Sequence, residues 1–159
     1  MLHREERANH PTLRRATPAD IEEIFEVRTS VRENHLSMEG LAERGVTPET
    51  FAATLSEPDW RTWVIEESGT IGGFAMASSK TGCVFALFVA PSLEGRGYGR
   101  ALLEQAERWL FDSGHEVIWL ETDQQPSTRA HRIYRSAGWI LVGPADHGDV
   151  RYEKKRSSG

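Results

Sequence analysis

The sequence lacks the features that mark secreted or membrane proteins. Its 159 residues include one cysteine, Cys83, so no intrachain disulfide can form. No apolar run approaches the roughly 20 residues that a membrane-spanning helix needs, and residues 1–7 contain no apolar core of a signal peptide. We therefore expect a soluble, cytoplasmic protein with no membrane partner.

An excess of positive charge is also missing. Lys and Arg number 19 against 24 Asp and Glu, and the two signs are mixed along the chain. Nucleic-acid-binding domains commonly carry a clustered basic face, so we expect no nucleic-acid partner. The length fits one domain with a substantial core. We expect that domain at residues 12–154, between a flexible N-terminus at 1–11 and a flexible tail at 155–159.

The longest apolar run covers residues 83–90 and predicts a central strand. It contains Val84, Phe85, Leu87, Phe88 and Val89, which are β-branched, aromatic or aliphatic. A run that is apolar at every position predicts burial on both faces of the sheet. Pro91 ends the run, because proline cannot donate a hydrogen bond to a strand ladder.

Three alternating glycines follow this strand, within residues 95–100. Behind them, apolar residues recur at steps of three and four, which predicts an amphipathic helix: Leu102, Leu103, Ala106, Trp109 and Leu110. A strand, a glycine loop and a helix N-terminus together can bind an anion. Glycine lets the backbone approach a ligand closely, and the first helical N–H groups lack partners inside the helix.

The spacing of the glycines distinguishes among phosphate-binding loops. A dinucleotide-binding fingerprint needs G-x-G-x-x-G, but Arg100 occupies its last position. A Walker loop ends in Gly-Lys-Ser/Thr, which is absent from residues 95–100. A glycine-rich turn that only caps a helix stays an alternative to phosphate binding.

Other patterns place the remaining elements. Strands are predicted at residues 12–16, 62–66, 71–77, 117–121, 139–142 and 150–153, with a bulge at Gly72-Gly73. Helices are predicted from Thr17-Pro18-Ala19-Asp20 to near Asn34, over residues 47–57, and over 127–138, where Gly138 stops the last one. The order is strand, two helices, three strands, helix, strand, helix and two strands.

Two segments of the sequence resemble the GCN5-related N-acetyltransferase (GNAT) family. The first is Leu87-Phe88-Val89 with the glycine loop, which is similar to the family's coenzyme A loop, Gln/Arg-x-x-Gly-x-Gly/Ala. Gly97 and Gly99 match, and Glu94 stands where the family has Gln or Arg. The second segment is similar to Asn-x-x-Ala-x-x-x-Tyr-x-x-x-Gly-Phe. Ala130, Tyr134 and Gly138 match, with Ser127 in place of Asn and Trp139 in place of Phe.

The resemblance implies an α/β (α+β) acyl-CoA N-acyltransferase fold. Its mixed sheet would have six to seven strands and about four flanking helices, and would splay between the fourth and fifth strands. Acetyl-CoA would be the co-substrate, with no metal. Its implied binding residues are Leu87, Phe88, Val89, Gly95, Arg96, Gly97, Tyr98, Gly99, Arg100 and Ser127. Surface solvation alone stays an alternative for Arg96.

Residue roles in the chemistry also follow from the resemblance. Tyr134 would protonate the departing thiolate, with a core tyrosine that makes a structural hydrogen bond as the alternative. Glu33 and Asn34 would contact the amine substrate. The general base stays open among Glu121, Asp123, Glu33, His35 and a chain of water molecules.

The predicted function is transfer of an acetyl group from acetyl-CoA to a primary amine of a small molecule, amino acid or protein. A non-catalytic coenzyme A sensor on the same scaffold is the first alternative, and an unrelated nucleotide-binding domain is the second. The oligomeric state stays open, with a homodimer as one alternative.

Overall fold

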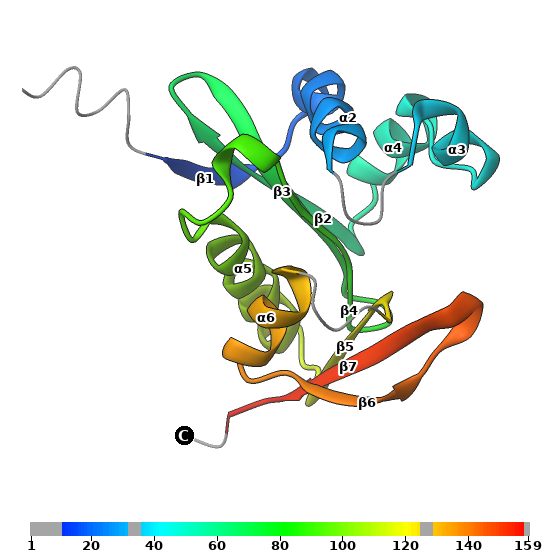
Figure 1. Ribbon diagram of the computed structural model, residues 1–159, viewed down its shortest axis with the longest axis vertical. Helices are drawn as coiled ribbons and strands as arrows, with labels where there is room; N and C mark the ends of the chain where they lie inside the picture. The colour runs from blue at the N-terminus through cyan, green and yellow to red at the C-terminus, as the bar shows by residue number, and fades with distance from the viewer. Residues whose placement is uncertain (1–10, 32–35, 125–128, 158–159) are drawn as a thin grey trace, which may run out of the picture.

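The structure is a computed structural model that describes residues 11–31, 36–124 and 129–157. Its centre is a seven-stranded mixed sheet in the order β1-β2-β3-β4-β5-β7-β6 (Figure 1). Among these strands only β4 and β5 pair in parallel. The strands are β1 (Thr12–Arg15), β2 (Trp60–Glu67), β3 (Thr70–Ser78), β4 (Cys83–Val89), β5 (Val117–Asp123), β6 (Ile140–Pro144) and β7 (Asp149–Lys155).

The helices cover both faces of this sheet. α2 (Ile21–Ser30), α3 (Met38–Glu43) and α4 (Pro48–Leu55) lie on one side, and α5 (Tyr98–Asp112) and α6 (Arg129–Ser136) lie on the other (Figure 1). Three short 3-10 turns are η1 (Pro18–Asp20), η2 (Pro91–Leu93) and η3 (Asp146–Gly148). None of the described helices is long and apolar enough to cross a membrane.

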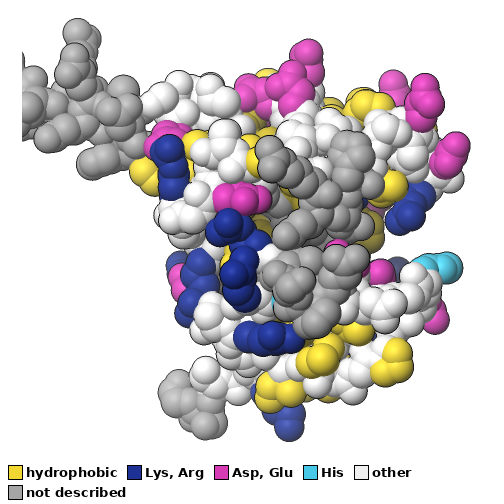
Figure 2. Space-filling model, in the orientation of Figure 1, with side chains coloured by type: hydrophobic (Ala, Val, Ile, Leu, Met, Phe, Trp, Pro, Cys, Tyr) yellow, Lys and Arg dark blue, Asp and Glu magenta, His cyan; other side chains and the backbone are white. Residues whose placement is uncertain are grey.

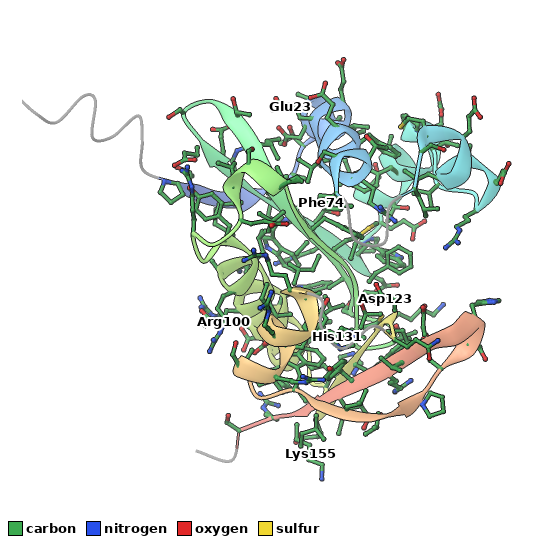
Figure 3. All side chains as sticks on the ribbon, in the orientation of Figure 1. Glu23, Phe74, Arg100, Asp123, His131 and Lys155 are labelled. Atoms are coloured by element: carbon green, nitrogen blue, oxygen red, sulfur yellow. The ribbon has the colours of Figure 1, made fainter. Side chains whose placement is uncertain are left out.

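Each face of the sheet has its own apolar core. Under α5, the fully buried side chains include Leu102, Leu103, Leu110, Ile118 and Leu120. Under α2 and α4, Ile24, Phe25, Phe51 and Val64 pack with Phe74, which Figure 3 labels between the sheet and the helices. Alternate residues of β3 and β4 contribute to the two cores, as the period of a strand requires.

The predicted fold class, element order and sheet size are confirmed, with two differences in the helices. The structure describes five α-helices rather than about four. α3 was not predicted from the sequence, because six residues are too few for a helical period to show. In the structure its N-terminus is capped, since the Ser37 hydroxyl accepts a hydrogen bond from the Gly40 N–H at 3.1 Å. The first helix ends at Ser30, and the predicted end near Asn34 lies outside the described residues. The predicted domain boundaries stay predictions.

The start of the first helix is fixed by the predicted tetrad. The Asp20 carboxylate accepts hydrogen bonds from the Thr17 N–H at 2.8 Å and from both terminal nitrogens of the Arg14 guanidinium at 2.8 and 2.9 Å. These bonds link β1 to the helical turn that leads into α2. The hydrogen bonds from Arg14 are the main cause that lowers the pKa of buried Asp20 to about 2. The hydrogen bond from the Thr17 N–H lowers this pKa further.

This lowered pKa predicts a pH dependence of stability. The pKa of Asp20 is lower in the folded protein than its ordinary value of 3.8. The Asp20 charge therefore contributes fully to the free energy of unfolding above pH 3.8, and this contribution is lost as the pH falls toward 2. Asp20→Asn should lower the free energy of unfolding by about 2 kcal/mol at pH 7 and by much less near pH 2. Urea denaturation at several pH values measures the difference. The exposed control Asp59→Asn should change little, and an equal loss at both pH values would contradict the role of the charge.

Candidate active site

The sheet opens between its two central strands. β4 and β5 form one Cα pair, Cys83 with Trp119, and the Trp119 N–H donates to the Gly82 carbonyl at 3.0 Å. Beyond that point the strands diverge (Figure 1). The predicted splay between the fourth and fifth strands is therefore confirmed.

A bulge in β4 lies close to this opening. Its ladder with β3 skips Phe85, since Met76 pairs with Ala86 and Ala77 pairs with Val84. Phe85 is 57% exposed, and the following residues of β4 are half-buried. The prediction that this strand is covered on both faces holds only in part beyond Val84. Leu87 and Val89 pack against one core and Ala86 and Phe88 against the other, but these residues also line an open cavity and Phe85 is exposed.

The direction of the β4 backbone follows from its remaining ladder. The Ala90 N–H, one residue past the strand, donates to the Gly72 carbonyl on the β3 side at 2.8 Å. N–H groups alternate in direction along an antiparallel strand. The N–H of Val89 therefore points away from β3, into the opening between β4 and β5.

This opening leads to a cavity of about 880 Å³. Its walls come from β4, the glycine loop, the start of α5, the end of β5 and α6. All predicted coenzyme-binding residues that the structure describes line it, with the exception of Arg96: Leu87, Phe88, Val89, Gly95, Gly97, Tyr98, Gly99 and Arg100. Ser127 lies outside the described residues.

The glycine loop turns its backbone toward the cavity. Gly97 is the N-cap of α5 and has φ +83°, a left-handed conformation that favours glycine. A Cβ at Gly97 would meet no atom within 4 Å, so the space beside it is open. Behind the loop, Leu93 fits against Gly72, where a Cβ would come within 2.3 Å of its side chain. The bulge predicted at Gly72-Gly73 is confirmed. The contact of Leu93 with Gly72 holds η2 and the glycine loop against β3.

The two predicted phosphate-binding arginines are engaged with acidic or polar neighbours. Arg96 forms an ion pair with Glu67 through hydrogen bonds of 2.8 and 2.9 Å. Arg100 lines the cavity and lies 3.3 Å from Glu104, and it donates to the Ser136 hydroxyl at 3.2 Å. Both side chains are about half-exposed. Arg100 therefore lies at the cavity, whereas Arg96 is held beside Glu67 on the rim.

Glu94 departs from the family pattern, and the structure shows what balances its charge. Its carboxylate lies 3.1 Å from the guanidinium of Arg129, at the start of α6, and both residues line the cavity. Figure 2 shows Lys and Arg side chains gathered over α5 and α6. The exposed arginines of these helices are Arg100, Arg108, Arg129, Arg132 and Arg135. The sequence reading did not single out Arg129, because its proximity to Glu94 depends on the tertiary fold.

Tyr134, on α6, lies in the cavity wall. Its ring is buried, with its centroid 5.5 Å from that of Tyr152 and 6.2 Å from that of Trp139. Burial raises the pKa of the hydroxyl well above its ordinary value, and Tyr152 and Asp123 raise it further. The hydroxyl therefore stays protonated near neutral pH and can donate a proton.

A second cavity, of about 600 Å³, lies under the other helices. It is bounded by α2, the segment from Leu36 to Thr54, β3, β4 and the neighbouring parts of β5 and β7. Five described residues line both cavities: Val84, Phe85, Ala86, Phe88 and Glu121. The two cavities therefore meet at the splay, and Glu121 is the one ionisable side chain among the described residues that borders both.

The other candidates for a general base are placed less favourably or not at all. Asp123 lines the first cavity but not the second. Glu33 and His35 lie outside the described residues, as does Asn34. No group of three or more metal-ligating side chains was found among the described residues.

A buried histidine that the sequence reading passed over secures the end of β5. His131 is 1% exposed; its Nε2 lies 2.7 Å from the Asp123 carbonyl and its Nδ1 lies 2.7 Å from the Tyr152 hydroxyl (Figure 3). A carbonyl only accepts, so Nε2–H donates to Asp123 and Nδ1 accepts from Tyr152. The single sequence signal was a polar residue on the apolar side of the helix.

Loss of this linkage should destabilise the fold. His131→Asn cannot reach both partners, which leaves buried polar groups without hydrogen bonds at a cost of about 1–3 kcal/mol each. We expect a lower free energy of unfolding by about 2–4 kcal/mol in urea denaturation. The control is His147→Asn. His147 is exposed and has a left-handed backbone with φ +59°, which asparagine also tolerates. Equal stability of His131→Asn and the wild type would contradict the assignment.

Comparisons with known proteins agree with this geometry. The model of the acetyltransferase (GNAT) family matches residues 21–139. A relative named IAA acetyltransferase, from Azospirillum brasilense, is 36% identical over 95 residues, which cover 57% of this chain and 61% of that protein. The chain thus belongs to the GNAT acetyltransferase family, as the motifs around Gly97 and Tyr134 predicted.

Solved structures show the same fold. The PaiA N-acetyltransferase from Thermoplasma acidophilum, in complex with coenzyme A, has a TM-score of 0.80 at 19% identity, over 92% of this chain and 99% of that chain. The protein yncA from Salmonella typhimurium, with its cofactor acetyl-CoA, has a TM-score of 0.73 at 20% identity, over 95% and 96% of the two chains. At these identities the likeness concerns the fold.

Proposed function

We propose that this protein is an N-acetyltransferase that transfers the acetyl group of acetyl-CoA directly to a primary amine. The observation that carries the proposal is the meeting of two cavities at one gap in the sheet. A coenzyme thioester in the larger cavity and an amine in the smaller one would face each other across that gap. Both substrates would then be held in contact without a covalent intermediate on the enzyme.

The larger cavity suits the coenzyme. The backbone at Gly95, Gly97 and Gly99, with the first N–H groups of α5, would bind the pyrophosphate. Arg100 and Arg129 border the same cavity and can add charge-assisted hydrogen bonds to phosphate oxygens. The pantetheine arm would lie along Leu87, Phe88 and Val89, and the inward-facing N–H of Val89 would donate to the carbonyl oxygen as it gains negative charge.

The proton transfers are assigned to two residues. Glu121, at the junction of the cavities, would accept a proton from the ammonium group, directly or through water, so that the neutral amine can attack the thioester carbon. The carbon–sulfur bond then breaks, and Tyr134 would donate its proton to the departing thiolate. The acylated nitrogen would lose its extra proton to the Tyr134 oxygen, directly or through water, which yields the amide and restores the hydroxyl. A hydroxyl with a raised pKa is protonated before the reaction, as this role requires.

Coenzyme binding is tested by a thermal-shift comparison of acetyl-CoA, ATP and NAD, since a ligand that binds the native state raises the melting temperature. Acetyl-CoA should protect the wild type best. Gly97→Glu should abolish that protection, because it places a carboxylate where the pyrophosphate would lie. Gly114→Glu is the matched control. Gly114 also has a left-handed φ, of +103°, a Cβ added there would also meet no atom within 4 Å, and it lies at the other end of α5. Better protection by ATP or NAD would contradict the proposal.

Catalysis is tested by thiol release in the presence of a panel of amines. Tyr134→Phe and Glu121→Gln should each lower kcat by about 100-fold or more while acetyl-CoA protection persists. Glu116→Gln, an exposed residue just before β5, should behave as the wild type. Protection by acetyl-CoA without turnover of any amine would instead identify a non-catalytic coenzyme A sensor.

A further inference from the structure

The second cavity has a chemical polarity that the transfer reaction alone does not require. Two acidic side chains, Glu121 and Asp149, border it on the side of β5 and β7. Two arginines, Arg28 and Arg44, border it on the side of α2 and α3. An acceptor that only presented an amine would need the acidic side alone.

Aromatic rings form much of the wall between these charges. Phe25 packs edge-on against Phe51 with centroids 5.7 Å apart, and Trp60 packs edge-on against Phe85 at 5.5 Å. Phe74 and Trp119 complete this lining. The exposed ring of Phe85 leaves apolar surface uncovered inside the protein's cleft, which favours an apolar ligand there.

Arg28 is positioned for recognition of an anion. Its guanidinium lies 4.2 Å from the ring centroid of Phe88, which itself borders both cavities. Burial lowers the pKa of Arg28, and the nearby charge of Arg44 lowers it further. Arginine nevertheless keeps its charge in proteins. A ligand carboxylate between Arg28 and Arg44 would offset both effects and could form bidentate hydrogen bonds.

We infer that the acceptor is a small aromatic amine that also carries a carboxylate, the class that includes aromatic amino acids. Its amine lies toward Glu121 at the splay, its ring lies among the aromatic side chains, and its carboxylate binds Arg28 and Arg44. A cavity of about 600 Å³ is within the range for such a small molecule. This inference rests on the proposed function for the turnover of the acceptor, but carboxylate binding can be measured without turnover.

Turnover is measured with matched pairs of acceptors that differ in the carboxylate: tryptophan with tryptamine, and phenylalanine with phenethylamine. In the wild type, kcat/KM should be at least about tenfold higher for each amino acid, because a hydrogen bond to a charged group contributes that much or more. Leucine should be a poorer substrate than phenylalanine. Higher kcat/KM for tryptamine, or equal values for leucine and phenylalanine, would overturn the assignment.

Arginine variants locate the carboxylate site. Arg28→Met keeps an apolar side chain over Phe88 and should lower kcat/KM for tryptophan by about 10- to 100-fold, with less than about a threefold change for tryptamine. Arg44→Met, at an exposed position, should act in the same direction. The control is Arg61→Met: Arg61 lies 5.1 Å from the Trp109 ring but lines neither cavity, so both substrates should be unaffected. Equal losses for the two acceptors would contradict the inference.

A binding measurement separates this inference from the proposed function. Indole-3-propionate carries the ring and carboxylate without the amine, and its amide lacks the charge. The acid should raise the melting temperature of the wild type more than the amide does, and Arg28→Met should remove that difference. If no amine were acetylated but this difference held, the catalytic proposal alone would fail. If acetylation occurred but the acid and amide bound equally, the carboxylate site would be wrong.

Discussion

The site depends on the point at which β4 stops hydrogen bonding to β5. A parallel pair in the middle of a sheet would normally continue its ladder for the length of the strands, because buried N–H and C=O groups need partners. Here the described pairing ends near Cys83 and Trp119. The rest of β4 therefore keeps its ladder with β3 on one side and presents its other N–H and C=O groups to a cavity. A ligand that is itself extended and rich in amides can satisfy them.

Several contacts keep the two halves of the sheet apart at that point. The bulge at Phe85 bends β4 close to the point where its pairing with β5 ends. Leu93 over Gly72 fixes the loop that follows β4, and His131 ties the end of β5 to α6 and β7 through Asp123 and Tyr152. The gap is thus held by packing on both sides. Such preorganisation reduces the entropic cost of binding.

The sequence was sufficient for most of the fold and for part of the site. Glycine spacing, helix caps and the strand patterns act locally, so the strands, the loop at Gly97 and the helix start at Asp20 could be read from the chain. α3 was missed because it is shorter than two turns. The exposure of β4 was also missed, since an apolar run looks the same whether it faces a core or a ligand cavity. The ion pair of Glu94 with Arg129 joins residues 35 positions apart, and only the fold brings them together.

The polarity of the second cavity illustrates the same limit. Arg28, Arg44, Glu121 and Asp149 come from four separate segments, and among them only Glu121 was singled out from the sequence, as one candidate for the general base. Their arrangement becomes meaningful because the fold brings them to one cavity, where Arg28 and Asp149 are half-buried and Arg44 and Glu121 are exposed. Electrostatic interactions strengthen at the half-buried positions, whereas exposed charges contribute little. Selectivity for the acceptor should therefore reside in the helices of the N-terminal half, and the chemistry of acetyl transfer in β4, β5 and α6. The two functions can then vary independently on one fold.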